Sequence, residues 1–192
     1  MPTETITDTD FIRLALENPL NRAILERLPA LGLDDVWLVA GSLFETVWNA
    51  RSDRPLTENI KDYDLFYYDG SDLSWEAEDA RIQHMKEVFG ELAEVIELKN
   101  QARVHLWYAD RFGHDYPALT SSRDGIDRFL VAGTCIGLRP APGGYELYAP
   151  YGIGDVADGI LRPNPKMLQP ELFKVKADNY RARWPWLTVA EA

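Results

Sequence analysis

The hydrophobic positions at the start of the chain change from helical spacing to a continuous run. Apolar residues recur at helical intervals over residues 10–18 and 19–28, which predicts two short helices. Pro29 and Gly32 end this pattern. The apolar run at 36–40 then predicts a central strand that is covered on both faces.

The pattern then alternates between helix and strand. A helix is predicted over 43–50, a polar loop over 51–61, and a second strand within 59–69, where the sequence reads NIKDYDLFYYD. Residues 75–89 carry apolar side chains at helical intervals, and Gly90 follows directly. This arrangement predicts a helix that ends at the glycine.

Two segments of the middle region, 93–98 and 102–108, both have the composition of strands. Because only a short polar connection separates them, we expect an antiparallel pair. The rest of the chain predicts a helix over 121–130, a hairpin around the Ala-Pro-Gly-Gly turn at 141–144, a loop over 151–165 and a helix over 170–184.

The whole pattern predicts an α/β (α+β) fold, with a mixed β-sheet flanked by helices. A length of 192 residues fits a single domain. Within it, we expect N-terminal helices over 1–34, a core over 36–110, and C-terminal helices, hairpin and loop over 120–192.

Charge narrows the choice of partners. The net charge is −11, from 20 basic and 31 acidic residues. Since binding to nucleic acid depends on neutralising phosphates, a long nucleic acid is predicted to be a poor partner. A small anionic ligand held by a few local groups stays compatible with this surface.

Cysteine content and hydropathy indicate the compartment. Cys135 is the single cysteine, so an internal disulfide and a cysteine-rich zinc site are both excluded. No run of eighteen apolar residues and no signal-peptide pattern is present, so we expect no membrane insertion. The prediction is a cytoplasmic protein.

Two carboxylates stand at the beginning of the second strand. Because side chains alternate across a strand, Asp62 and Asp64 are expected to project from one face about 6 to 7 Å apart. That spacing allows them to share a divalent cation. An oxygen-only ligand set suits Mg²⁺ or Mn²⁺, which complete their shells with water and substrate phosphates.

A Gly-Ser pair closes the first strand. Gly41 and Ser42 lead directly into a helix, so backbone N–H groups at this turn can hold a phosphate. Lys61, directly before the acidic pair, is positioned in sequence to neutralise Asp62 or to reach a phosphate. A phosphate-binding turn beside a metal-binding strand is typical of nucleotide chemistry.

These motifs resemble a known superfamily. The sequence VAGS, followed by a helix and DYDLF, resembles the Gly-Ser and Asp-x-Asp signature of the polymerase-β-like nucleotidyltransferases. The segments AGSLFETVWN, IKDYDLFYYD, NQARVHLWY and RPNP are similar to a family of bacterial nucleotidyltransferase-like proteins, over about Val36 to Trp184. The resemblance implies that Gly41 and Ser42 bind the triphosphate and that Asp62 and Asp64 hold the metal.

The sequence departs from the superfamily pattern at a third acidic position. The resemblance implies a further carboxylate on a neighbouring strand, but the corresponding residue is His105. Histidine is a poorer Mg²⁺ ligand, so Glu97 on the preceding predicted strand is the candidate substitute. Arg103 is expected on the same strand face as His105, where it could bind a phosphate.

The leading hypothesis is a Mg²⁺- or Mn²⁺-dependent transfer of a nucleoside monophosphate from an NTP to a small-molecule or protein acceptor. His105 or Glu97 would activate the acceptor hydroxyl, and Arg103 or Lys61 would steady the triphosphate. The missing third carboxylate motivates an alternative, an inactive module that binds a nucleotide or a protein partner. A glycosyltransferase that uses its Asp-x-Asp with a sugar nucleotide is a third possibility.

Overall fold

The computed structural model describes residues 6–190. Its helices are α1 (Asp8–Glu17), α2 (Pro19–Arg27), α3 (Gly41–Arg51), α4 (Trp75–Phe89), α5 (Val104–Phe112), α6 (Ser122–Ile126), α7 (Gly154–Asp158) and α8 (Pro170–Arg183). Its strands are β1 (Trp37–Val39), β2 (Tyr63–Tyr67), β3 (Ile96–Asn100), β4 (Gly137–Ala141), β5 (Gly144–Tyr148), β6 (Ile160–Leu161) and β7 (Thr188–Val189).

The main sheet has the strand order β3-β2-β1-β4-β5. Strand β2 runs parallel to β3, while the pairs β1–β2, β1–β4 and β4–β5 are antiparallel. The predicted mixed sheet is therefore confirmed, and β1 is its central strand. Strands β6 and β7 form a separate parallel pair, which the sequence pattern did not predict.

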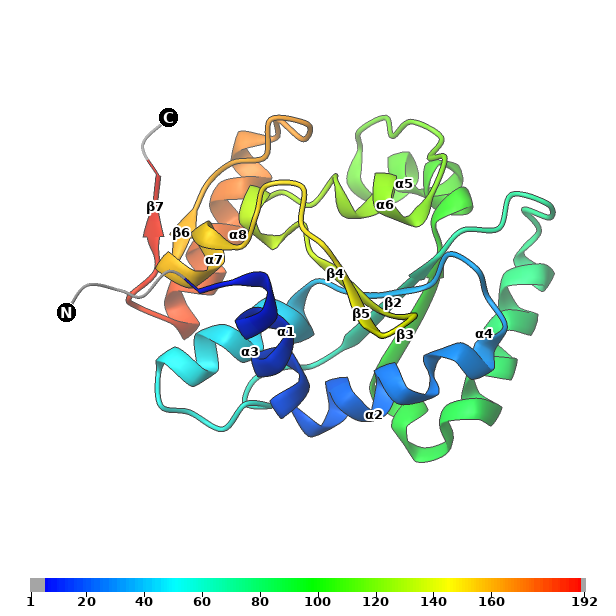
Figure 1. Cartoon of the computed structure of the whole chain (residues 1–192). Helices are drawn as coiled ribbons and strands as arrows, with labels where there is room; N and C mark the ends of the chain where they lie inside the picture. Colours follow the sequence, from blue (N-terminus) through cyan, green and yellow to red (C-terminus); the bar gives the residue numbers. More distant parts are fainter. Residues whose placement is uncertain (1–5, 191–192) are drawn as a thin grey trace.

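Helices lie on both sides of the sheet (Figure 1). On one face, Leu38 of β1 and Leu65 of β2 pack into a large core with residues of α1 to α4 and α8. On the other face, Trp37 and Val39 pack with Ile126 of α6. Since a one-residue step changes the face, the same alternation places Asp64 and Phe66 on the second face.

Most predicted helices and the hairpin are confirmed, and α4 has the predicted bounds. Two elements that the prediction missed, α7 and β6, lie within the segment expected to be a loop. The predicted antiparallel pairing of 93–98 with 102–108 is wrong. The strand predicted at 93–98 is confirmed in its second half, which begins β3 after a 3₁₀ turn, whereas the second segment lies mainly in helix α5.

The error at α5 has a physical cause in the side-chain spacing. Val104 and Tyr108 lie four residues apart, and Tyr108 and Phe112 repeat that interval, so they share one side of a helix. The prediction of a strand rests on the aromatic and β-branched residues of this segment, whose strand preference depends on context. Strand β3 pairs with β2 instead, and α4 forms the crossover.

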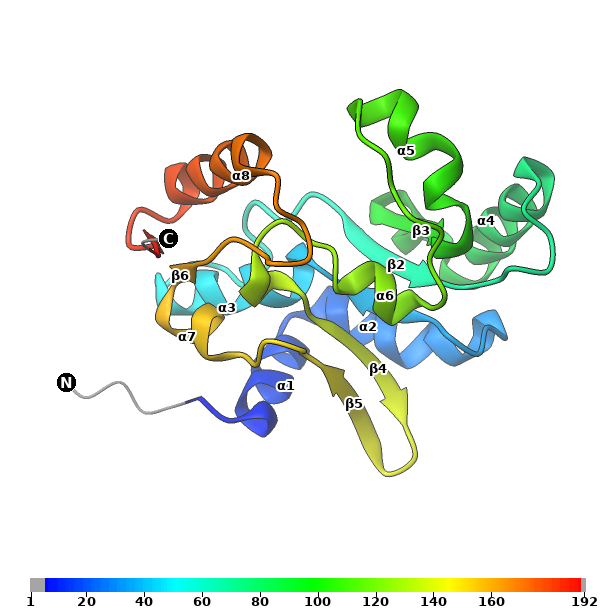
Figure 2. The same cartoon turned by 90° about the horizontal axis from the view of Figure 1, so that it is seen from above.

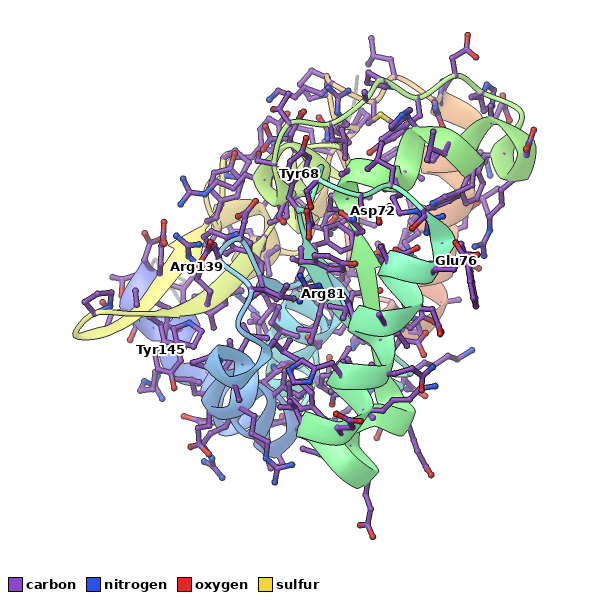
Figure 3. All side chains as sticks on the ribbon, turned by 90° about the vertical axis from the view of Figure 1, so that its right-hand side faces the viewer. Tyr68, Asp72, Glu76, Arg81, Arg139 and Tyr145 are labelled. Atoms are coloured by element: carbon purple, nitrogen blue, oxygen red, sulfur yellow. The ribbon has the colours of Figure 1, made fainter. Side chains whose placement is uncertain are left out.

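Figure 3 views the side of the molecule formed by α4 and the β4–β5 hairpin. Arg81, which this figure labels, extends from α4 and pairs with Asp69 at 3.6 Å. Asn100 at the end of β3 donates a 2.9 Å hydrogen bond to the carbonyl of Asp69. These contacts attach the loop after β2 to both α4 and β3, and so hold together the parallel pair that carries Asp64.

Cys135 lies in the smaller core and is 1% exposed. Burial raises the pKa of its thiol to about 12. Because the thiolate is the reactive form, we expect less than about a tenth of an equivalent of Cys135 to react with a thiol reagent at pH 8 in the native state. One full equivalent should react in denaturant, and fast stoichiometric labelling of the native protein would contradict this packing.

Candidate active site

The residues Gly41, Lys61, Asp62 and Asp64 line one cavity of about 570 Å³. Strand β2 supplies Asp64, Asp62 directly precedes this strand, and Gly41 begins α3. Antiparallel pairing of Val39 with Asp64 brings the end of β1 to the start of β2. The structure thus brings together the two motifs that the sequence analysis singled out.

The turn into α3 is held under local strain. Ala40 has φ 60° and ψ −133°, a conformation that is nearly restricted to glycine, while its N–H donates to the carbonyl of Ile136 at 3.2 Å. Asn21 of α2 donates to the carbonyl of Ser42 at 2.9 Å and fixes the first turn of the helix. The backbone is therefore set in one position where the cavity meets the helix.

Replacing Ala40 with glycine is expected to stabilise the protein by about 1 kcal/mol, because it removes the strained side chain. Equilibrium unfolding in urea measures this change. Ala50→Gly, within the helix that follows Ala40, is the matched control and should destabilise the protein by about 1 kcal/mol. Equal destabilisation by both substitutions would show that Ala40 is not strained.

Ser42 is completely buried, and its Oγ has no hydrogen-bond partner among the described residues. The first N–H groups of a helix also lack partners within the helix. Gly41 lies at the cavity wall, and the atoms nearest to a Cβ built there belong to the Glu45 carboxyl group, from 3.6 Å. Ser42 itself does not line the cavity, so the hydrogen-bond donors that the turn can offer to an anion near Gly41 are backbone N–H groups.

Helix α8 forms the opposite wall of the cavity. Lys176, Asn179, Tyr180 and Arg183 line it, and they follow one another at helical intervals. The helix is held at its C-terminal end, where Trp184 donates to Asn49 of α3 at 3.0 Å. Sequence analysis missed this wall, although the helical spacing of its polar residues was a signal.

Glu45 of α3 is the second residue that sequence analysis missed. Its side chain is 9% exposed and accepts a 2.8 Å hydrogen bond from Nη2 of Arg183. Burial raises the pKa of the Glu45 carboxyl group, while Arg183 lowers it. This ion pair links α3 to α8 across the cavity.

The cavity contains three cationic side chains and three carboxylates. Arg183 is paired with Glu45, and Asp64 contacts Lys99 at 3.3 Å. Within residues 6–190, neither Lys61 nor Lys176 takes part in an ion pair. These two ammonium groups are available to a polyanionic ligand.

The remaining predicted site residues lie elsewhere. Glu97 of β3 is aligned with Asp64 in the parallel register but does not line the cavity. Arg103 pairs with Glu78 of α4 and donates to the carbonyl of Leu73 at 3.0 Å. The strand expected to place His105 beside the acidic pair is helix α5, and His105 does not line the cavity.

The donor set fits a small divalent cation. Asp62 and Asp64, whose carboxylate oxygens are ligands that Mg²⁺ accepts, both line the cavity. Within the described part of the chain, His, Cys, Asp and Glu form no cluster of three or more that could enclose a metal. Mg²⁺ commonly binds through one or two carboxylates together with water and substrate phosphates, so two ligands suffice when a nucleotide is present.

Comparison with known proteins identifies the family. A family model described as nucleotidyltransferase matches residues 26–189. A solved structure whose description says that it reveals a CCA-adding enzyme head domain is 29% identical, with a TM-score of 0.77, covering 99% of this chain and 100% of that chain. A search of curated proteins finds no match. The chain belongs to a nucleotidyltransferase family and has the fold of a nucleotidyltransferase head domain.

Proposed function

We propose that the chain transfers a nucleoside monophosphate from an NTP to an acceptor hydroxyl. The observation that carries this proposal is that Asp62 and Asp64 line the same cavity as the Gly41 turn. Family membership supplies the reaction class. Among residues 6–190, no helix is both long enough and apolar enough to cross a membrane.

In this proposal the triphosphate lies between the first turn of α3 and the cationic wall of α8. Gly41 allows close approach of the phosphate to the backbone N–H groups of the turn, and Lys61, Lys176 and Arg183 neutralise phosphate charge. A Mg²⁺ or Mn²⁺ ion held by Asp62 and Asp64 would lower the cost of charge that develops on the phosphate oxygens.

The proposed reaction forms a bond from the acceptor oxygen to the α-phosphorus. The bond from that phosphorus to the bridging oxygen of the β-phosphate breaks, and pyrophosphate leaves. The hydroxyl proton passes to solvent water, because Glu97, the carboxylate expected to accept it, lies outside the cavity and is paired with Lys99 at 2.6 Å. His105 and Arg103 have no part in this scheme.

A net charge of −11 favours a small-molecule or protein acceptor. Similarity to a structure described as a CCA-adding enzyme head domain makes nucleic acid the rival acceptor. A pyrophosphate-release assay with each acceptor class distinguishes them.

Calorimetric titration with each of the four ribonucleoside triphosphates tests the proposal. We expect binding in the presence of Mn²⁺ and loss of that binding in excess chelator, because the ion joins the carboxylates to the phosphates. If none of the four triphosphates binds in a metal-dependent manner, the proposal is contradicted.

One observation favours a second candidate function. The acidic pair has no third carboxylate within the described residues that could complete a metal cluster. An inactive module would bind the nucleotide without turnover. Binding accompanied by no pyrophosphate release, with any acceptor class, would favour the module over the enzyme.

A further inference from the structure

Strands β2 and β3 place three charged side chains on one face of the sheet. Asp64 is aligned with Glu97, and Phe66 with Lys99, in the parallel register. Since residues two apart share a face, Glu97 and Lys99 project on the same side as Asp64. Figure 2 shows the two strands side by side.

Lys99 connects the two carboxylates. Its Nζ lies 3.3 Å from Oδ1 of Asp64 and 2.6 Å from Oε2 of Glu97. The side chains of Asp64, Lys99 and Glu97 are 25%, 40% and 50% exposed. Lys99 does not itself line the cavity but touches Asp64, which does, and its contact with Asp64 is partly shielded from water.

This contact divides the oxygens of Asp64 between two cations. Oδ1 faces Lys99, which leaves the second oxygen for an ion shared with Asp62. A divalent ion that used Asp64 together with Glu97 would have to displace the ammonium group, which is a compact point charge suited to this position. The carboxylates of Asp64 and Glu97 therefore already share one cation, the ammonium group of Lys99.

We propose that the ammonium group of Lys99 occupies the position between Asp64 and Glu97 where a second divalent ion would otherwise bind, so that the site takes one divalent ion instead of two. This inference rests on the proposed function. Lys99 is a positioning residue. It holds the carboxylates of Asp64 and Glu97 in place without contacting the α-phosphate. This role accounts for an acidic pair that lacks a third acidic metal ligand.

The test counts bound Mn²⁺ per chain, by electron paramagnetic resonance of free Mn²⁺ during titration. We expect one ion in the wild type and two in Lys99→Met, because removing the charge frees Asp64 and Glu97 for a second ion. The first ion should also bind about tenfold tighter in Lys99→Met, since a neighbouring positive charge is lost.

Three further variants are controls for the loss of charge at Lys99. Lys99→Arg keeps the charge and should retain one ion, while Lys99→Met with Glu97→Gln should return to one. Lys174→Met, which removes an exposed lysine of α8 that pairs with Asp178, should bind one ion with unchanged affinity. Circular dichroism and thermal unfolding verify that each variant is folded.

Two bound ions in the wild type would overturn the inference about Lys99, as would one ion in a folded Lys99→Met protein. Both results leave the proposed function standing. A wild type that binds no Mn²⁺, with or without an NTP, contradicts the proposed function itself, and the inference about Lys99 then falls with it.

Discussion

Replacing Asp64 with asparagine is expected to raise the dissociation constant of the Mn²⁺–NTP complex by about 100-fold. Removing even an indirect partner of a metal ligand costs about 10- to 100-fold in affinity, and Asp64 is proposed as a direct ligand. Asparagine has nearly the same shape, so the β-sheet should be preserved. Calorimetry measures the loss.

Asp110→Asn is the matched control for this substitution. Asp110 lies on the exposed surface of α5, outside the cavity, so its replacement should leave affinity unchanged. If Asp64→Asn bound the metal-nucleotide complex as tightly as Asp110→Asn, Asp64 would not be a ligand.

Replacing Arg183 with methionine is expected to destabilise the protein by about 3 kcal/mol at pH 7. The substitution leaves the Glu45 carboxylate buried without its partner, and breaking a buried pair in this way is costly. Methionine keeps part of the apolar contact with the neighbouring ring of Trp184. Urea unfolding measures the free energy.

The pH dependence of this loss has a definite sign. Burial raises the folded-state pKa of Glu45 above its unfolded value, so the ionised carboxylate costs stability at neutral pH. That cost disappears as pH falls through the folded-state pKa, because the proton neutralises the group. Without Arg183 the folded-state pKa of Glu45 rises further. The destabilisation caused by Arg183→Met should therefore become smaller as the pH is lowered from 7 into the acidic range.

Two variants separate the ion pair from the general effect of removing an arginine. Arg181→Met removes an exposed arginine from the same helix and should change stability by less than about 0.5 kcal/mol. The double variant Glu45→Gln with Arg183→Met should regain part of the loss, since no buried charge remains. A loss in Arg183→Met no larger than that in Arg181→Met would contradict a buried pair.

The sequence predicted that Asp62 and Asp64 would lie together in the candidate site, and local rules explain why. Alternation along a strand set Asp62 and Asp64 on one side, and the turn residues marked the start of α3. Both motifs lie close together along the chain. Their meeting in one cavity follows from the pairing of two neighbouring strands.

The cationic half could not be predicted in the same way. From the sequence alone, Lys176 and Arg183 cannot be distinguished from ordinary surface residues, because the packing of α8 determines that they line the cavity. Contacts between Trp184 and α3 determine that packing, and they join residues far apart in sequence. The residue composition around His105 favours a strand, but in the folded protein this segment is helix α5, because strand preference depends on the packing context.

A crystal soaked with Mn²⁺ and a non-hydrolysable ATP analogue tests the central claim most directly. We predict an anomalous scattering peak shared by the carboxylates of Asp62 and Asp64, with the triphosphate lying between Gly41 and Arg183. Nucleotide bound away from this cavity, or a peak that contacts neither carboxylate, would contradict the account.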